Sequence, residues 1–251
     1  MAVSAPTPRR RRVLRGLSAL LVAAGLLVLA DGAATLLWQE PLTALQTKLR
    51  QDRLGTDLRR LEASGPTRLE AHQLARIAGR RHRIAFLARS LRRHAAEGTA
   101  VGRIRIPRLG ASFVVVKGTS AADLRKGPGA YAQAPLPGAP GTAAIAGHRT
   151  THLAPFRHID ALRQGDPIVI EMPYGTFTYR VQHTRIVDAH ALWILRRMPY
   201  DRLVLSACHP LFSASRRIVV FARLTGVVPR RPAPAGQGVQ NARTRFTPAP
   251  S

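Results

Sequence analysis

Cys208 is the only cysteine in the 251 residues of the chain. A lone thiol excludes an intramolecular disulfide framework and any zinc or iron–sulfur site with four cysteine ligands. Two roles remain, a small buried hydrophobe or a nucleophile whose thiolate is stabilised by a nearby cation or imidazole. The alternating run Leu203–Cys208 predicts a strand, and His209-Pro210 follows it, where proline stops the ladder. We therefore expect the thiol at the end of a strand.

A cysteine that attacks a carbonyl group needs a histidine to move protons and a donor to stabilise the oxyanion. His148 comes directly after the apolar run Thr142–Ala146 and Gly147, and Arg217 begins the run Ile218–Leu224, nine residues after Cys208. Taken singly, such a histidine is most often structural and such an arginine is most often solvated. A hairpin connection would bring Arg217 back across the thiol, whereas strand alternation sends the adjacent Arg216 to the opposite face.

His148 and His152 are four residues apart, a spacing that two ligands of one metal ion can have. No carboxylate accompanies them at a recognised metalloenzyme spacing, and the Gly and Thr neighbours argue against a helix that would align them. We therefore predict no metal and no other cofactor. His152, His158, His183 and His190 are expected on the surface or in packing contacts.

Two motifs and one arginine occur in the order that sortases use: Ala-Gly-His-Arg-Thr-Thr at 146–151, Leu-Ser-Ala-Cys-His-Pro at 205–210, and Arg217. On these residues the chain resembles a class E sortase over about residues 101–224, with class D close. The Cys-His-Pro continuation and the Gly-His-Arg-Thr-Thr block favour class E.

This resemblance implies a membrane-anchored cysteine transpeptidase that cleaves a sorting signal between Thr and Gly. Cys208 would be the nucleophile that forms a thioacyl enzyme, His148 the general acid and base, and Arg217 the group that holds the substrate and the oxyanion. The implied signal is Leu-Ala-x-Thr-Gly in preference to Leu-Pro-x-Thr-Gly. The implied partners are secreted proteins that carry the signal, and a peptidoglycan precursor or pilin that supplies the amine.

The chain departs from the family in the strand before the nucleophile, which normally reads Thr-Leu-x-Thr-Cys. Here the sequence is Val-Leu-Ser-Ala-Cys at 204–208, so both threonines are absent. The threonine before the cysteine is thought to assist contacts with the substrate and the oxyanion, and Ala207 replaces it. The alternative function is therefore a catalytically weak, sortase-like binding or scaffold module.

Short runs of β-type residues, punctuated by Gly and Pro, must position these side chains. Eight of them predict a closed, mainly β, sortase-type barrel, since closure removes the sheet edges. Short helical signals lie at Ser120–Leu124 and Pro155–Leu162. The predicted strands are Ile104–Ile106, Phe113–Lys117, Thr142–Ala146, Pro167–Glu171, Thr176–Val181, Arg185–Asp188, Leu203–Cys208 and Ile218–Leu224.

The remaining segments predict a topology. Residues 1–16 are basic, and 17–38 form an apolar stretch of 22 residues, long enough for a transmembrane helix. The arginines before this stretch favour a cytoplasmic N-terminus, which would place the catalytic domain, 101–226, outside the cell. Residues 39–100 show helical periodicity and read as a juxtamembrane stalk, while 227–251 form a Pro/Arg-rich tail that should be disordered.

The charge of the chain is strongly basic, with 39 Lys and Arg against 13 Asp and Glu and a formal net charge of +26. The bases are spread over every segment and are nearly all arginine. No helix-turn-helix, zinc-finger or aromatic RNA-binding signature accompanies them, so we predict no nucleic-acid partner. An anionic polymer or a membrane surface is a compatible neighbour.

Overall fold

The computed structural model describes residues 8–37 and 41–230. The chain divides into two compact units, Met1–Leu42 and Thr43–Ser251. Residues 231–251 of the predicted tail lie outside the described residues. The first three residues of that predicted tail, 227–229, are the end of strand β8.

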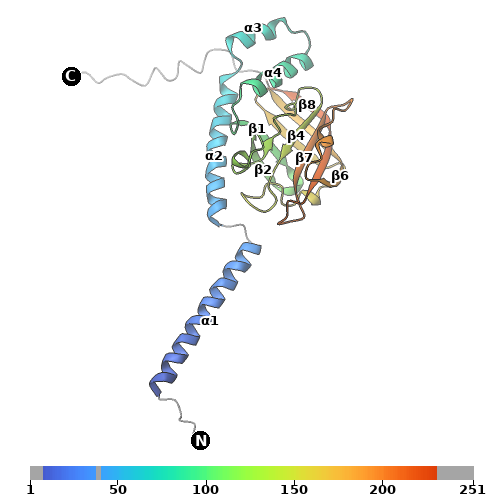
Figure 1. Ribbon diagram of the computed structural model, residues 1–251. Coiled ribbons are helices and arrows are strands. Elements are labelled where there is room, and N and C mark those ends of the chain that lie inside the picture. The colour runs from blue at the N-terminus through green and yellow to red at the C-terminus, as the bar shows by residue number, and fades with distance from the viewer. Residues whose placement is uncertain (1–7, 38–40, 231–251) are drawn as a thin grey trace, which may run out of the picture. The chain divides into compact units, whose positions relative to one another are not determined.

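The first unit contains helix α1, Pro8–Leu37, which covers most of the predicted membrane anchor at 17–38 (Figure 1). Its leucine and valine side chains from Leu17 to Leu29 are exposed. In the part of the chain that the structure describes, no helix is long and apolar enough to cross a membrane. The prediction of a transmembrane helix is therefore not supported.

The second unit is built on a closed barrel of eight strands, as predicted. The strand order around the barrel is β1-β2-β3-β4-β7-β8-β6-β5. The pairs β2–β3 and β4–β7 are parallel and the others are antiparallel. The strands are β1 Ala100–Ile106, β2 Ala111–Lys117, β3 Gly129–Ala130, β4 Thr142–Ala146, β5 Pro167–Met172, β6 Gly175–Asp188, β7 Arg202–His209 and β8 Arg216–Pro229.

The eight observed strands are not the eight predicted ones. The runs Thr176–Val181 and Arg185–Asp188 are parts of one strand, β6, whose pairing with β8 shifts register between Val181 and His183. This irregularity interrupts the alternation and made one strand look like two. The two-residue strand β3 escaped prediction because Gly129 and Ala130 have no β-type signature. A Cβ on Gly129 would lie 2.0 Å from the carbonyl oxygen of Gly118, so this close approach requires glycine.

Four short helical turns connect the strands. Helix α5, Ala121–Leu124, lies where a helical signal was predicted, and Ser120 caps it by accepting a hydrogen bond from the Asp123 amide. The second predicted signal corresponds to the 3-10 turn η2, Ile159–Ala161. The other two turns are η1, Pro107–Leu109, and η3, Leu192–Leu195.

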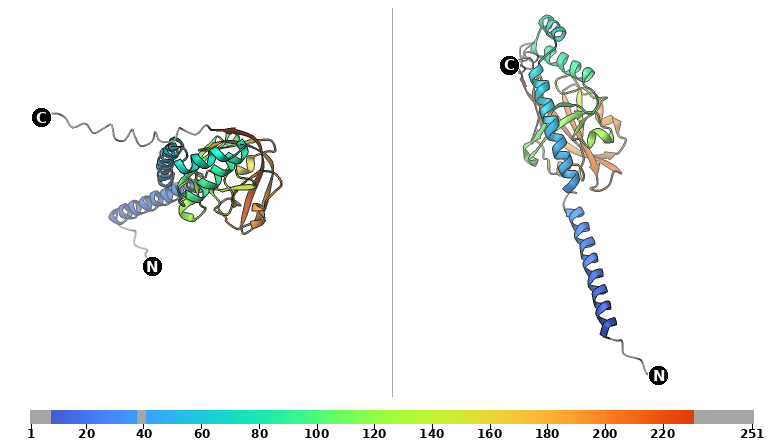
Figure 2. Two further views of the ribbon diagram at one scale, coloured as in Figure 1. Left: turned by 90° about the horizontal axis from the view of Figure 1, so that it is seen from above. Right: turned by 90° about the vertical axis from the view of Figure 1, so that its left-hand side faces the viewer.

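Three helices occupy the predicted stalk: α2 Pro41–Ser64, α3 Arg68–Arg76 and α4 Arg80–His94. Figure 1 and Figure 2 show α2 running along the side of the barrel and α4 lying over one of its ends. Leu54 and Leu58 of α2 form a buried cluster with Ala100 and the β2 valines. Ile84 and Ala88 of α4 belong to the main core that fills the barrel. The helical segment is thus packed onto the barrel as part of the same compact unit.

Candidate active site

Strand β7 carries the cysteine at its end and presents it away from the barrel interior. Leu203, Leu205 and Ala207 belong to the main core cluster, so the alternate residues Val204, Ser206 and Cys208 face outward. The Cys208 thiol is free and half-buried. Its position at the end of a strand is the one that the sequence predicted.

The register of β7 with β8 places Arg217 directly across from Cys208. Side chains of directly paired residues in an antiparallel ladder lie on the same face, so the guanidinium and the thiol share the outer face. The Arg217 Nη1 donates hydrogen bonds to the carbonyl oxygens of Ala214 at 2.8 Å and Arg216 at 3.0 Å. Arg216 itself pairs with His209 and is exposed.

His148 follows strand β4, which pairs with the other side of β7 in parallel. Ala146 is paired with Ser206, and the Gly147 amide donates a hydrogen bond to the Ser206 carbonyl oxygen at 3.0 Å. Because parallel strands end at the same edge, His148 emerges beside Cys208. The three predicted site residues therefore lie at one end of three neighbouring strands, with the cysteine in the middle.

The imidazole of His148 is half-buried, and its Nε2 atom is buried with no hydrogen-bond partner in residues 8–37 and 41–230. Burial lowers the pKa of His148, and the charge of His152 lowers it further. The two rings are 5.0 Å apart between centroids. The neutral imidazole is therefore favoured near neutral pH, and its unpaired nitrogen is available to exchange a proton with a bound substrate.

Packing fixes the backbone on both sides of His148. A Cβ on Gly147 would lie 2.6 Å from the ring of Phe156, which is fully buried. The Phe156 amide in turn donates a hydrogen bond to the His148 carbonyl oxygen at 3.0 Å. Glycine at 147 therefore lets the aromatic ring support the turn that carries the histidine.

Arg149 is a site residue that the sequence did not identify. Its side chain is only 3% exposed, and its Nη2 forms an ion pair with Asp160 at 3.0 Å. Its Nη1 lies 3.3 Å from the Nδ1 of His209, the residue after Cys208. Arg149 thus connects the loop of His148 to the end of β7. Its position directly after His148 in the 146–151 motif was the available signal.

Ala207 lies in the barrel core with 2% exposure, on the opposite face of β7 from Cys208. A threonine at position 207 would therefore point into the barrel core and not toward the Cys208 thiol on the outer face. The polar neighbour of the thiol on that face is Ser206, whose hydroxyl lies 2.9 Å from the hydroxyl of Tyr131.

The other histidines have separate environments. His183 stacks on Phe221 at 4.8 Å, and burial and then the charges of Arg185 and Arg202 lower its pKa. His158 and His190 are exposed. Among the described residues, no group of three or more His, Cys, Asp or Glu side chains is arranged to hold a metal ion.

Exposed apolar side chains occur in the two loops beside the outer face of β7 and β8. Trp193 of η3 is 48% exposed and stacks on Phe221 of β8 at 6.1 Å. Leu211 and Phe212 follow Cys208 and are 39% and 61% exposed. Large apolar groups left in solvent are typical of a surface that binds a partly apolar ligand.

A thiol that lies between an imidazole and a guanidinium is the set of groups that a thiol-dependent acyl-transfer enzyme uses. Comparison with known proteins identifies the domain. The sortase-domain family model matches residues 104–225, which span the barrel, so this chain carries a sortase domain.

Two relatives illustrate the similarity. Sortase D of Bacillus subtilis (strain 168) is 33% identical over 130 residues, which are 50% of this chain and 64% of that protein. Sortase SrtE1 of Streptomyces coelicolor is 28% identical over 149 residues, which are 53% of this chain and 42% of that protein. The chain thus spans less than two thirds of the length of either relative.

A crystal structure of Sortase E1 from Streptomyces coelicolor with a tripeptide in the active site is also similar. It is 28% identical, with a TM-score of 0.51, and the alignment covers 53% of this chain and 92% of that chain. Together with the sequence similarity to SrtE1 and SrtE2 of that organism, this match supports the class E assignment.

Proposed function

We propose that this protein is a transpeptidase that cleaves a C-terminal sorting signal between Thr and Gly and joins the new carboxyl end to an amine. The observation that carries the proposal is the strand register, which pairs Cys208 with Arg217 and brings His148 to the same end of the barrel. The nucleophile, the proton carrier and the cationic donor of an acyl transfer are thereby adjacent.

In the first half of the reaction, neutral His148 takes up the proton of the Cys208 thiol, and the resulting thiolate attacks the carbonyl carbon of the signal threonine. A C–S bond forms, the Thr–Gly C–N bond breaks, and protonated His148 donates its proton to the departing glycine amine. In the second half, the acceptor amine attacks the thioester, His148 takes up the proton of that amine, and the C–S bond breaks. The released thiolate takes this proton back from His148, so the thiol is regenerated and protons balance over the cycle.

Arg217 stabilises the oxyanion and holds the substrate backbone in this proposal. Its guanidinium donates to the carbonyl oxygens of Ala214 and Arg216 in the free protein. A substrate carbonyl or oxyanion replaces one of these acceptors, and a charge-assisted hydrogen bond to a developing negative charge is stronger than one to a neutral carbonyl. The guanidinium has further N–H groups, so the exchange need not break both loop contacts.

The proposed signal is Leu-Ala-x-Thr-Gly, with Leu-Pro-x-Thr-Gly as the second candidate. Exposed Trp193, Leu211 and Phe212 lie in the loops beside β7 and β8 and offer an apolar surface for the leucine of the signal. The proposed substrates are secreted proteins that end in this signal, and the acceptor amine belongs to a peptidoglycan precursor or a pilin. We further propose that the sortase domain acts outside the cytoplasm at the cell membrane, where such partners meet.

The test is mass spectrometry of the purified full-length protein incubated with a Leu-Ala-x-Thr-Gly peptide and a triglycine amine. We expect the ligated peptide with the native protein, no product with Cys208→Ala, and a much lower rate with His148→Ala or Arg217→Ala. Arg216→Ala, which changes an exposed neighbour, serves as the control and should retain activity. A parallel reaction with a Leu-Pro-x-Thr-Gly peptide shows which of the two signals the protein prefers.

The alternative of a sortase-like binding module gives the opposite result. Such a module would yield neither ligated peptide nor a thioacyl adduct on Cys208, while still binding the signal peptide. Binding without any adduct would therefore refute the transpeptidase proposal.

A further inference from the structure

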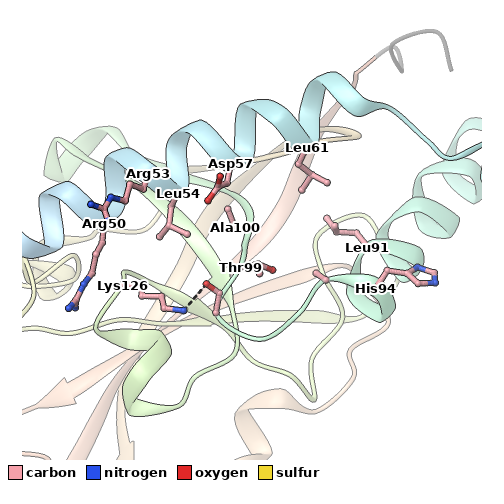
Figure 3. A pocket seen from close by; sticks show the side chains of 12 residues that line it. Arg50, Arg53, Leu54, Asp57, Leu61, Leu91, His94, Thr99, Ala100 and Lys126 are labelled. Atoms are coloured by element: carbon pink, nitrogen blue, oxygen red, sulfur yellow. Dashed lines mark hydrogen bonds between the residues drawn. The ribbon is translucent and has the colours of Figure 1, made fainter. Parts of the chain in front are cut away.

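Helix α2 is flanked by two hollows, and they differ in character. The first, shown in Figure 3, has a volume of about 580 Å³ and a floor of Leu54, Leu61 and Leu91. Cations at its edge are hydrogen-bonded to the protein: Lys126 donates to the Gly98 carbonyl oxygen at 3.1 Å, and Arg50 to that of Arg125 at 3.5 Å. Arg53 also lines this hollow and makes no hydrogen bond or ion pair with the described residues, but the leucine floor favours an apolar ligand over a charged one.

The second hollow, of about 500 Å³, lies between α2, strands β1 and β2, and the loop after His148. Lys48 and Arg59 of α2 and Arg103 of β1 line it, against a single acid, Asp52. We call this site the α2 basic hollow. Its lining carries a net positive charge and therefore favours an anionic ligand.

Two guanidinium groups converge in the α2 basic hollow above Gly55. A Cβ placed on Gly55 would lie 3.7 Å from the Arg103 Nη2 and 3.7 Å from the Arg59 Nη1. The two nitrogen atoms are therefore at most twice this distance apart, and the Arg59 Nη2 donates a hydrogen bond to the Thr56 hydroxyl at 3.0 Å. Like charges that line one hollow repel each other, and a bound anion would offset this repulsion.

Arg103 is half-buried, yet its guanidinium makes no hydrogen bond or ion pair with any residue that the structure describes. The acid paired across from it in the sheet is Glu171, and that carboxylate binds Arg105 at 2.7 Å. A partly desolvated cation without a counter-charge is unfavourable for folding alone. Such an arrangement is expected where a ligand supplies the negative charge.

The α2 basic hollow shares a wall with the catalytic loop. Leu153 lines the hollow and lies five residues after His148. His152, Leu153 and Ala154 have φ angles of 52°, 62° and 37°, and the ring of His152 packs on that of His148. Three consecutive left-handed non-glycine residues are an uncommon conformation that surrounding structure must hold in place. Leu153 thus joins the lining of the hollow to the segment that carries His148 and His152.

We propose that the α2 basic hollow binds a phosphate group carried by the amine acceptor. This inference rests on the proposed transpeptidase function, in which His148 deprotonates the incoming amine, so the acceptor approaches from the His148 side. Arg103 and Arg59 bind the phosphate oxygens as a guanidinium pair, and Lys48 adds a third cation. A phosphorylated acceptor is thereby held with its amine directed toward the thioester.

The first test measures binding without catalysis, by isothermal titration of inorganic pyrophosphate into the full-length protein at low salt. We expect one saturable site, weakened about tenfold or more by Arg103→Gln and by Arg59→Gln. Arg59 is exposed on α2, so its variant keeps the fold if Arg103→Gln does not. Arg60→Gln removes a charge from the same helix outside the hollow and should change the affinity less than about twofold.

The second test compares two acceptors, triglycyl-serine and triglycyl-phosphoserine, in the transfer reaction. We expect the phosphorylated acceptor to have a KM about tenfold lower with an unchanged kcat, and Arg103→Gln to abolish this difference while the KM of the signal peptide stays the same. Equal pyrophosphate affinity in the native protein, Arg103→Gln and Arg60→Gln would overturn the anion site.

The two tests also separate this inference from the function on which it rests. Specific pyrophosphate binding together with transfer that ignores the phosphate would overturn the acceptor role. Specific binding with no transfer to either acceptor would support the anion site and refute the transpeptidase function together with the acceptor role.

Discussion

The protonation state of His148 is set by its immediate neighbours. His148 is kept mostly neutral by burial and by His152, and its Nε2 has no partner among the described residues. Because its pKa in the folded protein lies below the unfolded value, the unfolded chain binds more protons there as the pH falls. His148 therefore contributes stability above its unfolded pKa, and this contribution is lost as the pH drops through the folded value.

His152→Asn tests this electrostatic coupling. Asparagine tolerates the left-handed backbone of this position and carries no charge, so the pKa of His148 should rise while remaining below its usual range because burial persists. The measurement is an NMR titration of the His148 ring, with exposed His158→Asn as the control. An unchanged pKa in His152→Asn would show that the neighbouring charge does not act on His148.

Ala207→Thr tests the departure from the family sequence. Threonine at this buried position adds two heavy atoms to a packed core, so we expect the free energy of unfolding to fall by about 1–3 kcal/mol. The kcat of peptide transfer should change little because position 207 faces away from the thiol. Urea unfolding and the transfer assay measure both effects, with exposed Ala63→Thr as the matched control. A large gain in kcat would contradict the orientation argument.

At the scale of elements, helix α2 supplies hydrogen bonds to backbone groups of β2 that the short strand β3 leaves unpaired. Strand β3 pairs with β2 only at Val116 and Lys117. The side-chain amide of Gln51 accepts a hydrogen bond from the Val114 amide at 2.7 Å and donates to the Val114 and Lys126 carbonyl oxygens at 3.1 and 2.7 Å. One glutamine on the helix thus replaces the missing ladder contacts and holds α2 on the barrel.

Gln51→Ala leaves the Val114 amide and carbonyl without their partner in a half-buried place. The expected loss is about 1–3 kcal/mol in the free energy of unfolding. Gln46→Ala, at an exposed position on the same helix, is the matched control and should change stability by less than about 0.5 kcal/mol. Chemical denaturation of both variants decides the point, and equal midpoints would mean that Gln51 does not anchor the helix.

At the scale of the whole molecule, the helices before the barrel are part of its core. Leu54 and Leu58 cover β2, and Ile84 lies in the main core, each with less than 9% exposure. Burying one such side chain contributes about 1.5–3 kcal/mol, which is large beside the 5–15 kcal/mol that typically stabilises a domain.

A fragment of residues 43–230 should therefore unfold cooperatively, whereas 96–230, without α2, α3 and α4, should have a much lower urea midpoint or aggregate. Circular dichroism during urea titration measures the difference. The same midpoint for both fragments would show that the helices are dispensable for the barrel.

The sequence by itself named the candidate side chains and most of the barrel. Cys208 stood out as the single thiol, and His148 and Arg217 were named because the 146–151 motif, the 205–210 motif and Arg217 occur in the order that sortases use. Six predicted strands correspond one to one with observed ones, because alternation of side chains is a local property of the chain.

Only the tertiary structure decided which residues meet. The register that pairs Cys208 with Arg217, the insertion of Gln51 beside Val114 and the convergence of Arg59 with Arg103 all join positions that lie apart along the chain. The same is true of the packing that puts Ala207 inside the barrel and α4 against it. Periodicity reports which face of an element is apolar, but strand pairing and close packing select the partner of that face, and they depend on the whole fold.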